Sequence, residues 1–147
     1  MRNDMHHAQI VLYGEIYGPG IQALGYGVKP GEVQFVAFDL KLDGKFLDYD
    51  KFTAACDLFG VPRVPELYRG LFDVSIVKAL SEGPTLLNGG PHYREGVVVK
   101  PVIEDSNEYG RMVQKYVGDQ FLTAKGDAAE DLSNDAAEAE GVTEDAA

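Results

Sequence analysis

Two apolar runs in the first third of the chain predict β-strands. Residues Gln9 to Tyr17 (QIVLYGEIY) are rich in β-branched and aromatic side chains, and Gly18-Pro19-Gly20 follows them as a turn or loop. Residues Val33 to Leu42 (VQFVAFDLKL) carry Phe and Val at both odd and even positions, which indicates a strand that is covered on two faces. Asp43-Gly44 is a favoured two-residue hairpin turn, so we expect a return strand after it.

The next apolar positions repeat at helical spacing. They are Phe52, Ala55, Cys56 and Phe59. Either Asp48 or Asp50 is available as the N-cap of this helix, and Gly60 can end it. The spacing makes Cys56 a residue of the core.

The rest of the folded part alternates extended and helical segments. Pro62 and Pro65 require an extended chain. A short helix is expected from about Ser75 to Leu80. Two further strands are predicted, from Gly96 to Val102 and from Gly110 to Val117. Antiparallel β-sheets with short helices indicate an α+β domain.

Charge divides the chain into two parts. The 147 residues include 13 Lys and Arg against 24 Asp and Glu, a formal net charge of −11. Eight of the acidic residues, and none of the basic ones, lie between Gly126 and Ala147, a segment with little to bury. We expect residues 1–125 to form the folded domain and residues 126–147 to be a disordered acidic tail. A tail that competes with nucleic acid for a basic groove is the functional alternative.

Cysteine content and the length of the apolar runs indicate in which cellular compartment the protein occurs. Cys56 is the only cysteine in the sequence, which excludes an internal disulfide and Cys-rich zinc sites. No apolar run reaches the roughly 18–20 residues that span a bilayer, and the N-terminal sequence has no signal-peptide character. We therefore expect a cytoplasmic protein that does not enter a membrane.

Four charged residues interrupt or flank the predicted strands. Glu15 lies in the first apolar run, Glu95 and Lys100 flank GVVV, and Lys115 lies in MVQKYV. A charge buried without a partner in such a run costs several kcal/mol. These side chains therefore either lie on strand edges or in internal ion pairs, or they line a functional site. The residue pattern leaves both alternatives open.

Four segments in this order resemble motifs of the covalent nucleotidyltransferase superfamily of polynucleotide ligases and capping enzymes, and most of all those of ATP-dependent RNA ligases. GEIYGPGIQ resembles the third motif, FVAFDL the next, EGVVVKP the fourth, and GRMVQKYV with Phe121 the fifth. The match runs from about Val11 to Phe121. It implies a partial nucleotidyltransferase domain of the ATP-grasp-like ligase type.

The resemblance also implies roles for individual residues. Glu15 would accept a hydrogen bond from the nucleotide ribose, and Phe38 would stack on the adenine. Glu95 would help to hold the divalent metal, normally Mg²⁺. Lys100 and Lys115 would be catalytic, facing the phosphates and stabilising the charge that develops on the leaving pyrophosphate.

The implied reaction is the ATP-dependent joining of an RNA 5′-phosphate to a 3′-hydroxyl through AMP transfer, a reaction of RNA repair. ATP, Mg²⁺ and nicked or broken RNA are the implied cofactors and substrates. The family's fifth motif often has a second lysine, and Val117 occupies that position here. The family also forms AMP-lysine at a K-x-D-G motif before the third motif, but the ten residues before Val11 contain no lysine.

Lys41-Leu42-Asp43-Gly44 spells K-x-D-G, but it continues the predicted adenine-stacking strand, so we interpret it as a hairpin turn. The chain is thus expected to be the C-terminal part of an adenylation domain, unable to adenylate itself. The alternatives are a noncatalytic nucleotide- or RNA-binding module, or one half of a split ligase. Missing neighbouring strands would favour a homo-oligomer or an N-terminal ligase fragment as partner, with Val11, Ile16 and Tyr17 near the contact.

Other aromatic and basic residues are weaker candidates. Four tyrosines can stack on bases, although packing explains them equally well: Tyr17, Tyr26, Tyr93 and Tyr116. Four arginines can contact phosphates: Arg63, Arg69, Arg94 and Arg111.

Overall fold

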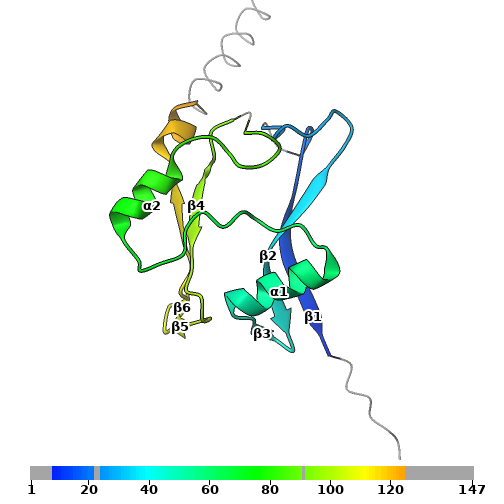
Figure 1. Cartoon of the computed structure of the whole chain (residues 1–147), viewed down its shortest axis with the longest axis vertical. Coiled ribbons are helices and arrows are strands. Elements are labelled where there is room, and N and C mark those ends of the chain that lie inside the picture. The colour runs from blue at the N-terminus through cyan, green and yellow to red at the C-terminus, as the bar shows by residue number, and fades with distance from the viewer. Residues whose placement is uncertain (1–7, 22–23, 91, 125–147) are drawn as a thin grey trace, which may run out of the picture.

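Antiparallel strands and short helices make up the fold, which confirms the predicted α+β class (Figure 1). The computed structural model describes residues 8–21, 24–90 and 92–124. The acidic tail predicted for residues 126–147 lies outside the described residues. Among the helices within these ranges, none is long and apolar enough to cross a membrane.

The first sheet contains both early strands and the predicted hairpin. Strands β1 (Ile10–Tyr17), β2 (Gln34–Leu42) and β3 (Lys45–Phe46) are antiparallel and lie in that order. Asp43 and Gly44 connect β2 to β3 with φ angles of 48° and 79°. Two consecutive residues with positive φ are what a type I′ hairpin turn requires. The Asp-Gly turn and its return strand are therefore confirmed.

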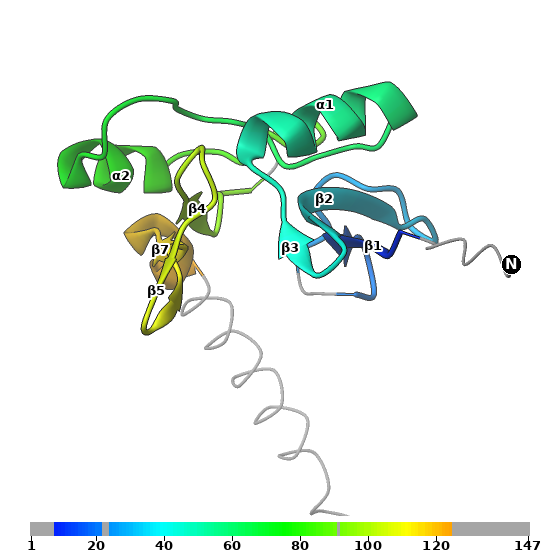
Figure 2. The ribbon, with the colours of Figure 1, turned by 90° about the horizontal axis from the view of Figure 1, so that it is seen from below.

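Helix α1 (Tyr49–Phe59) packs against β2 (Figure 2). Ala37 of β2 is buried together with Phe52 and Cys56 of the helix, which confirms Cys56 as a core residue. Gly60 follows the helix in the left-handed conformation, with φ of 64°, as expected for a helix end.

Asp48 occupies the N-cap position of α1 but does not cap the helix with its side chain. Its carboxylate accepts hydrogen bonds from Lys51 Nζ at 2.8 Å and from the backbone N–H of Glu104 at 3.0 Å. The residue predicted as a cap thus ties the start of α1 to a segment 56 residues later.

A β-bulge interrupts the pairing of β1 with β2. Gly14 pairs with Ala37, whereas Tyr13 pairs with Asp39, so Phe38 is an extra residue without a partner in β1. Bulges of this kind bend a strand and redirect side chains. Phe38 therefore lies at a point where the backbone departs from regular pairing.

The bulge also exchanges the two faces of β2. Before the bulge, the odd-numbered residues Phe35 and Ala37 belong to the core under α1. After the bulge, the even-numbered residue Leu40 belongs to the same core. Because a slip of one residue moves every later side chain to the opposite face, Asp39 and Lys41 lie on the face away from the α1 core. We call this the inner face; β1 contributes Tyr13, Glu15 and Tyr17 to it.

A second small core lies on the inner face. Tyr17 is buried there with Val28 and Val36, and Tyr26 packs against the cluster. The sequence predicts Tyr17 near an oligomer contact, but only 5% of this residue is accessible, so it belongs to this core and not to an exposed apolar patch. Ile16, on the opposite face of β1, is exposed.

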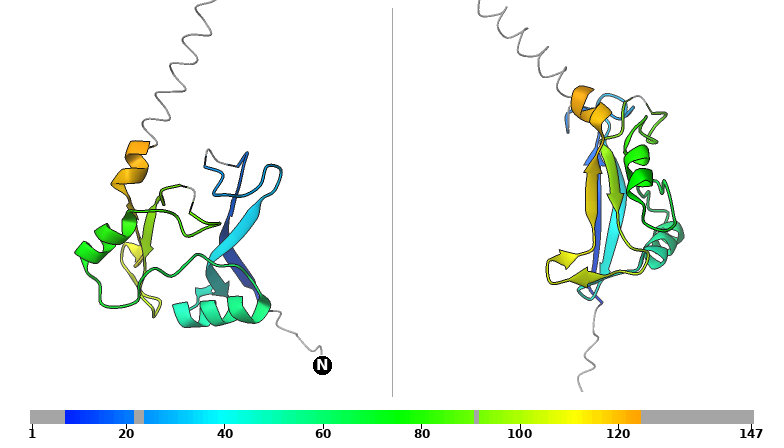
Figure 3. Two further views of the ribbon diagram at one scale, coloured as in Figure 1. Left: turned by 45° about the horizontal axis from the view of Figure 1, so that its top comes forward. Right: turned by 90° about the vertical axis from the view of Figure 1, so that its left-hand side faces the viewer.

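The second sheet pairs β4 (Gly96–Val99) with β7 (Gln114–Val117), and helix α2 (Val74–Ser81) packs on one side of it. The two sheets lie side by side in Figure 1, and the right-hand view of Figure 3 shows one behind the other. The backbone N–H of Tyr49 donates to the carbonyl of Val102 at 2.8 Å, and the Asn88 side chain donates to the carbonyl of Tyr26 at 3.1 Å. These bonds join the two halves of the fold.

Both later strands differ from the prediction. The strand predicted from Gly96 to Val102 ends at Val99, because Pro101 has no N–H to offer a neighbouring strand. The strand predicted from Gly110 to Val117 is broken: β6 (Gly110–Arg111) pairs with the unpredicted β5 (Ser106–Asn107), and β7 begins at Gln114. Residues 119–124 form a helix that the sequence reasoning did not predict.

Candidate functional site

Phe38 and Lys100 are in direct contact, although 62 residues separate them. Lys100 Nζ donates one hydrogen bond to the Phe38 carbonyl oxygen at 2.7 Å and another to Asp39 Oδ1 at 2.8 Å. An ammonium group has three N–H donors, and the described residues provide hydrogen-bond acceptors for two of them, so one donor remains. The Nζ atom also lies 5.2 Å from the centre of the Phe52 ring and 5.4 Å from that of Tyr49. The Phe38 residue is 39% exposed, so part of this large apolar residue is accessible to solvent.

Asp39 connects two cations across the inner face. Its carboxylate contacts Lys100 through one oxygen and the Arg111 Nη1 atom, at 3.0 Å, through the other. Arg111 also forms a two-pronged ion pair with Glu104, at 2.5 and 2.7 Å. Hydrogen bonds to Glu104, and next to Asp39, raise the pKa of Arg111 above its ordinary value against the opposing effect of burial. The network is formally neutral and mostly shielded from solvent.

Glu95 and Lys115 form an ion pair that is about half exposed. Burial raises the pKa of the Tyr26 hydroxyl most, and the negative charges of Glu95 and then Glu15 raise it further. Both carboxylates therefore lie within electrostatic reach of one phenol group. Within the described ranges, the Glu15 side chain has no hydrogen bond or ion pair.

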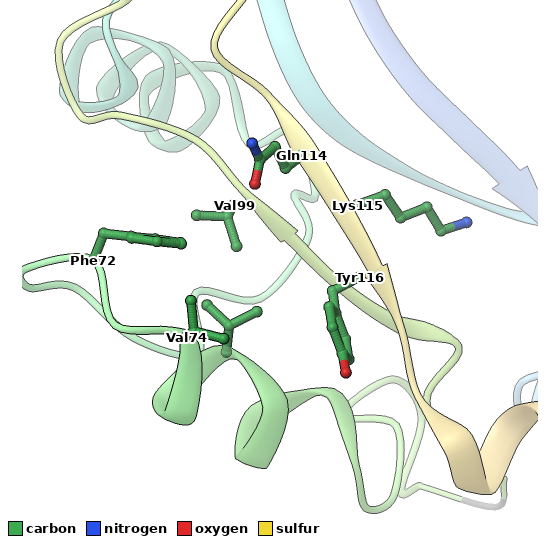
Figure 4. A pocket seen from close by; sticks show the side chains of 7 residues that line it. Phe72, Val74, Val99, Gln114, Lys115 and Tyr116 are labelled. Carbon is green, nitrogen blue, oxygen red and sulfur yellow. The ribbon is translucent and has the colours of Figure 1, made fainter.

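A cavity of about 110 Å³ lies on the other side of β7, between this strand and α2 (Figure 4). Phe72, Val74 and Val99 line it with Tyr116, whereas Lys115 extends away to the opposite side of β7. Pockets for small molecules usually measure roughly 300–1,000 Å³. This cavity is too small for a nucleotide, so the candidate site lies on the Lys115 side.

The structure brings four of the five predicted site residues into two contacting pairs. Phe38 with Lys100 forms one, and Glu95 with Lys115 forms the other, whereas Glu15 has no hydrogen bond or ion pair with either among the described residues. The ion-pair alternative is confirmed for Glu95, Lys100 and Lys115. These ion pairs do not exclude a functional site, because the Glu95–Lys115 pair is accessible to solvent and Lys100 keeps one N–H donor for a further acceptor.

Sequence reasoning missed two members of the site and undervalued two others. Asp39 and Glu104 were missed, and Tyr26 and Arg111 were weak candidates. Asp39 carried the same signal as Glu15, a carboxylate inside an apolar strand. Glu104 carried no such signal, because its partner Arg111 is positioned by the β5–β6 hairpin, which the sequence did not predict.

The hairpin interpretation of Lys41 is confirmed, since the residue belongs to β2 and Asp43-Gly44 forms the turn to β3. Its Nζ lies 4.4 Å from the centre of the Phe46 ring and 5.7 Å from that of Tyr13.

Among the described residues, the side chains do not form a complete metal cage. No group of three or more His, Cys, Asp or Glu that could hold a metal occurs among the residues described. Mg²⁺, however, is usually bound by one or two carboxylates together with substrate phosphates. Glu95 fits such an open arrangement, provided that a phosphate-bearing substrate supplies the remaining ligands.

Comparison with known proteins connects this geometry to a family. No curated protein and no solved structure matches the chain. A family model described as RNA ligase matches residues 1–117. That segment covers most of the 147 residues and includes both contacting pairs described above, and so the chain belongs to the RNA ligase family.

Proposed function

We propose that this chain binds ATP and RNA ends and takes part in joining an RNA 5′-phosphate to a 3′-hydroxyl through AMP transfer. The observation that carries the proposal is the contact between Phe38 and Lys100. The family resemblance implies a base-stacking role for Phe38 and a phosphate role for Lys100, and these residues of distant segments are joined by the hydrogen bond from Lys100 Nζ to the Phe38 backbone carbonyl. The family match supports the same reaction class.

The nucleoside would lie against Phe38 and Glu15. The exposed Phe38 ring offers a stacking surface, and base stacking on an aromatic residue contributes about 1–3 kcal/mol. Glu15 is exposed on the same sheet and has no partner among the described residues, so its carboxylate is available to accept a hydrogen bond from a ribose hydroxyl.

The phosphates would lie between Lys100 and Lys115. Lys100 uses its remaining donor while Asp39 and the Phe38 carbonyl hold it in place. Lys115 would exchange its exposed pair with Glu95 for a phosphate, a change that costs little because exposed ion pairs contribute at most about 1 kcal/mol. Both cations then stabilise negative charge that develops during phosphoryl transfer.

Once Lys115 turns to a phosphate, Glu95 becomes free to act as a metal ligand. Bound Mg²⁺ would supply additional positive charge for the phosphates and the leaving group. The chain's own contribution would be the Glu95 carboxylate, which Lys115 holds in an ion pair until the phosphate replaces it.

The first step of the family reaction needs a lysine that this sequence does not offer in the expected place. Its first lysine, Lys29, follows the segment that resembles the third motif, and Lys41 lies in a hairpin. We therefore expect that the 147-residue chain does not become labelled by radioactive AMP from ATP. A labelled band that disappears with Lys41→Ala would contradict the hairpin interpretation.

The final step can be tested without that lysine. In a nicked RNA with AMP already attached to the 5′-phosphate, the 3′-hydroxyl oxygen attacks the RNA phosphorus, the bond to AMP breaks, and the hydroxyl proton passes to solvent. We expect joined product with the unmodified chain and a loss of at least tenfold in rate with Lys115→Ala. The matched control is Lys78→Ala, which removes an exposed lysine from α2.

Two results would contradict the proposal. Failure of a folded chain to join this substrate, while it still binds ATP, would favour the noncatalytic binding module. Equal losses for Lys115→Ala and Lys78→Ala would mean that Lys115 has no specific role.

A further inference from the structure

One end of the inner face carries cations and aromatic rings in close contact. We call the residues Tyr13, Lys41, Phe46 and Arg111 the hairpin surface. The Tyr13 and Phe46 rings lie 5.4 Å apart between centres. Lys41 Nζ lies 4.4 Å from the centre of the Phe46 ring, and Arg111 Cζ lies 3.4 Å from it. Cations that interleave with aromatic rings are the chemistry of single-stranded nucleic acid binding.

Lys41 differs from most other cations of the described chain. Six of these cations have a carboxylate within ion-pair distance: Lys51, Arg63, Arg69, Lys100, Arg111 and Lys115. Lys41 has none within the described ranges, and it lies over two rings instead. The nearby Asp43 carboxylate accepts a hydrogen bond from the backbone N–H of Gln9 at 2.8 Å. The Lys41 charge is thus available to an anion.

The hairpin surface is continuous with the proposed nucleotide site. Tyr13 lies two residues from Glu15 on the same face of β1, about 7 Å along the strand. Asp39, which pairs with Tyr13, contacts both Lys100 of the site and Arg111 of the hairpin surface. A polymer whose reacting end lies at Phe38 and Lys100 can therefore follow the inner face to Lys41.

We propose that the hairpin surface binds the RNA strand that leads away from the reacting end, with Lys41 contacting a backbone phosphate and Tyr13 a base. The inference rests on the proposed function, because the location of the reacting end comes from it. It adds a binding surface that lies outside the residues assigned to the nucleotide.

The experiment measures binding of a short, fluorescently labelled single-stranded RNA of mixed sequence by anisotropy over a series of salt concentrations. Each phosphate contact contributes about 0.7 to the slope of log affinity against log salt for a single strand. We expect Lys41→Gln to reduce the slope by about this amount. Tyr13→Leu should weaken binding about tenfold and leave the slope unchanged, because stacking is lost but no phosphate contact is removed.

Lys45→Gln is the matched control. Lys45 lies four residues away on the same hairpin, is exposed, and pairs with Leu42, so its side chain points to the face opposite Lys41. Both substitutions change the net charge equally. A urea denaturation curve for each variant shows whether the fold is retained.

Four outcomes would overturn the inference. The first is that the unmodified chain binds no RNA, and the second is that Lys41→Gln and Lys45→Gln have equal effects. The third is that Lys41→Gln leaves the slope of log affinity against log salt unchanged. The fourth is that the chain binds an acidic peptide in place of RNA and that this binding depends on Lys41. ATP binding, measured in parallel, separates the two proposals. A chain that binds ATP but meets one of these outcomes loses only the hairpin surface, whereas a chain that binds neither ligand loses both.

Discussion

Replacing Asp39 by Asn removes the charge that holds two cations at the inner face. The Asp39 side chain is 8% exposed, and those of Lys100 and Arg111 are 17% and 25% exposed. Removal of one partner from a buried ion pair costs roughly 3–5 kcal/mol, because the remaining charge stays buried. Arg111 keeps its two-pronged contact with Glu104, so the penalty falls mainly on Lys100. We therefore expect a loss of about 3 kcal/mol, the lower end of that range.

Urea denaturation followed by circular dichroism measures this loss. With a denaturant dependence of about 1–3 kcal/mol per molar urea, the midpoint should fall by about 1–3 M. Asp57→Asn is the control, because it breaks a more exposed pair with Arg63 at 3.4 Å, for which we expect less than about 1 kcal/mol. Equal midpoints for the two variants would refute the reasoning that the Asp39 network is buried and stabilising.

Three further predictions concern the rest of the chain. Gly14→Ala should destabilise the fold by about 1–3 kcal/mol in the same urea assay, because an added Cβ would lie 2.1 Å from the Phe35 ring; Gly25→Ala, with its nearest neighbour at 3.5 Å, should have little effect. Hydrogen bonds from the Ser75 hydroxyl and backbone N–H lower the pKa of Asp73. The stability that the Asp73 carboxylate contributes is therefore present above the unfolded pKa near 3.8 and is lost as the pH falls through the lower folded pKa. Asp73→Asn should accordingly weaken the dependence of the urea midpoint on pH in this window. Deletion of residues 126–147 should leave the melting temperature unchanged, because their composition offers little apolar surface to bury.

Local patterns predicted the elements that depend on local chemistry. The two early strands, the Asp43-Gly44 turn and α1 with its end at Gly60 follow from side-chain spacing and from residues that tolerate positive φ. Each lies within one or two residues of its predicted bounds. The family resemblance added the set of site residues, and the structure joins Phe38 to Lys100.

Long-range pairing set the features that the sequence did not predict. The bulge at Phe38 lies in VAFD, where apolar residues occupy both parities, so no alternation shows the change of face. Arg111 reaches Asp39 across 72 residues. Its position depends on the turn after Asn107, whose side chain accepts a hydrogen bond from the backbone N–H of Tyr109. Such contacts follow from the fold as a whole.

Calorimetric titration of the chain with ATP and Mg²⁺ tests the central claim, a nucleotide site at Phe38 and Lys100, most directly. We predict binding that Phe38→Ala weakens about tenfold or more, since a stacked base contributes about 1–3 kcal/mol. Tyr109→Ala, which removes an aromatic residue that is 89% exposed in the turn between β5 and β6, should leave the affinity unchanged. No detectable binding by a folded sample, or equal losses for the two variants, would contradict the nucleotide site.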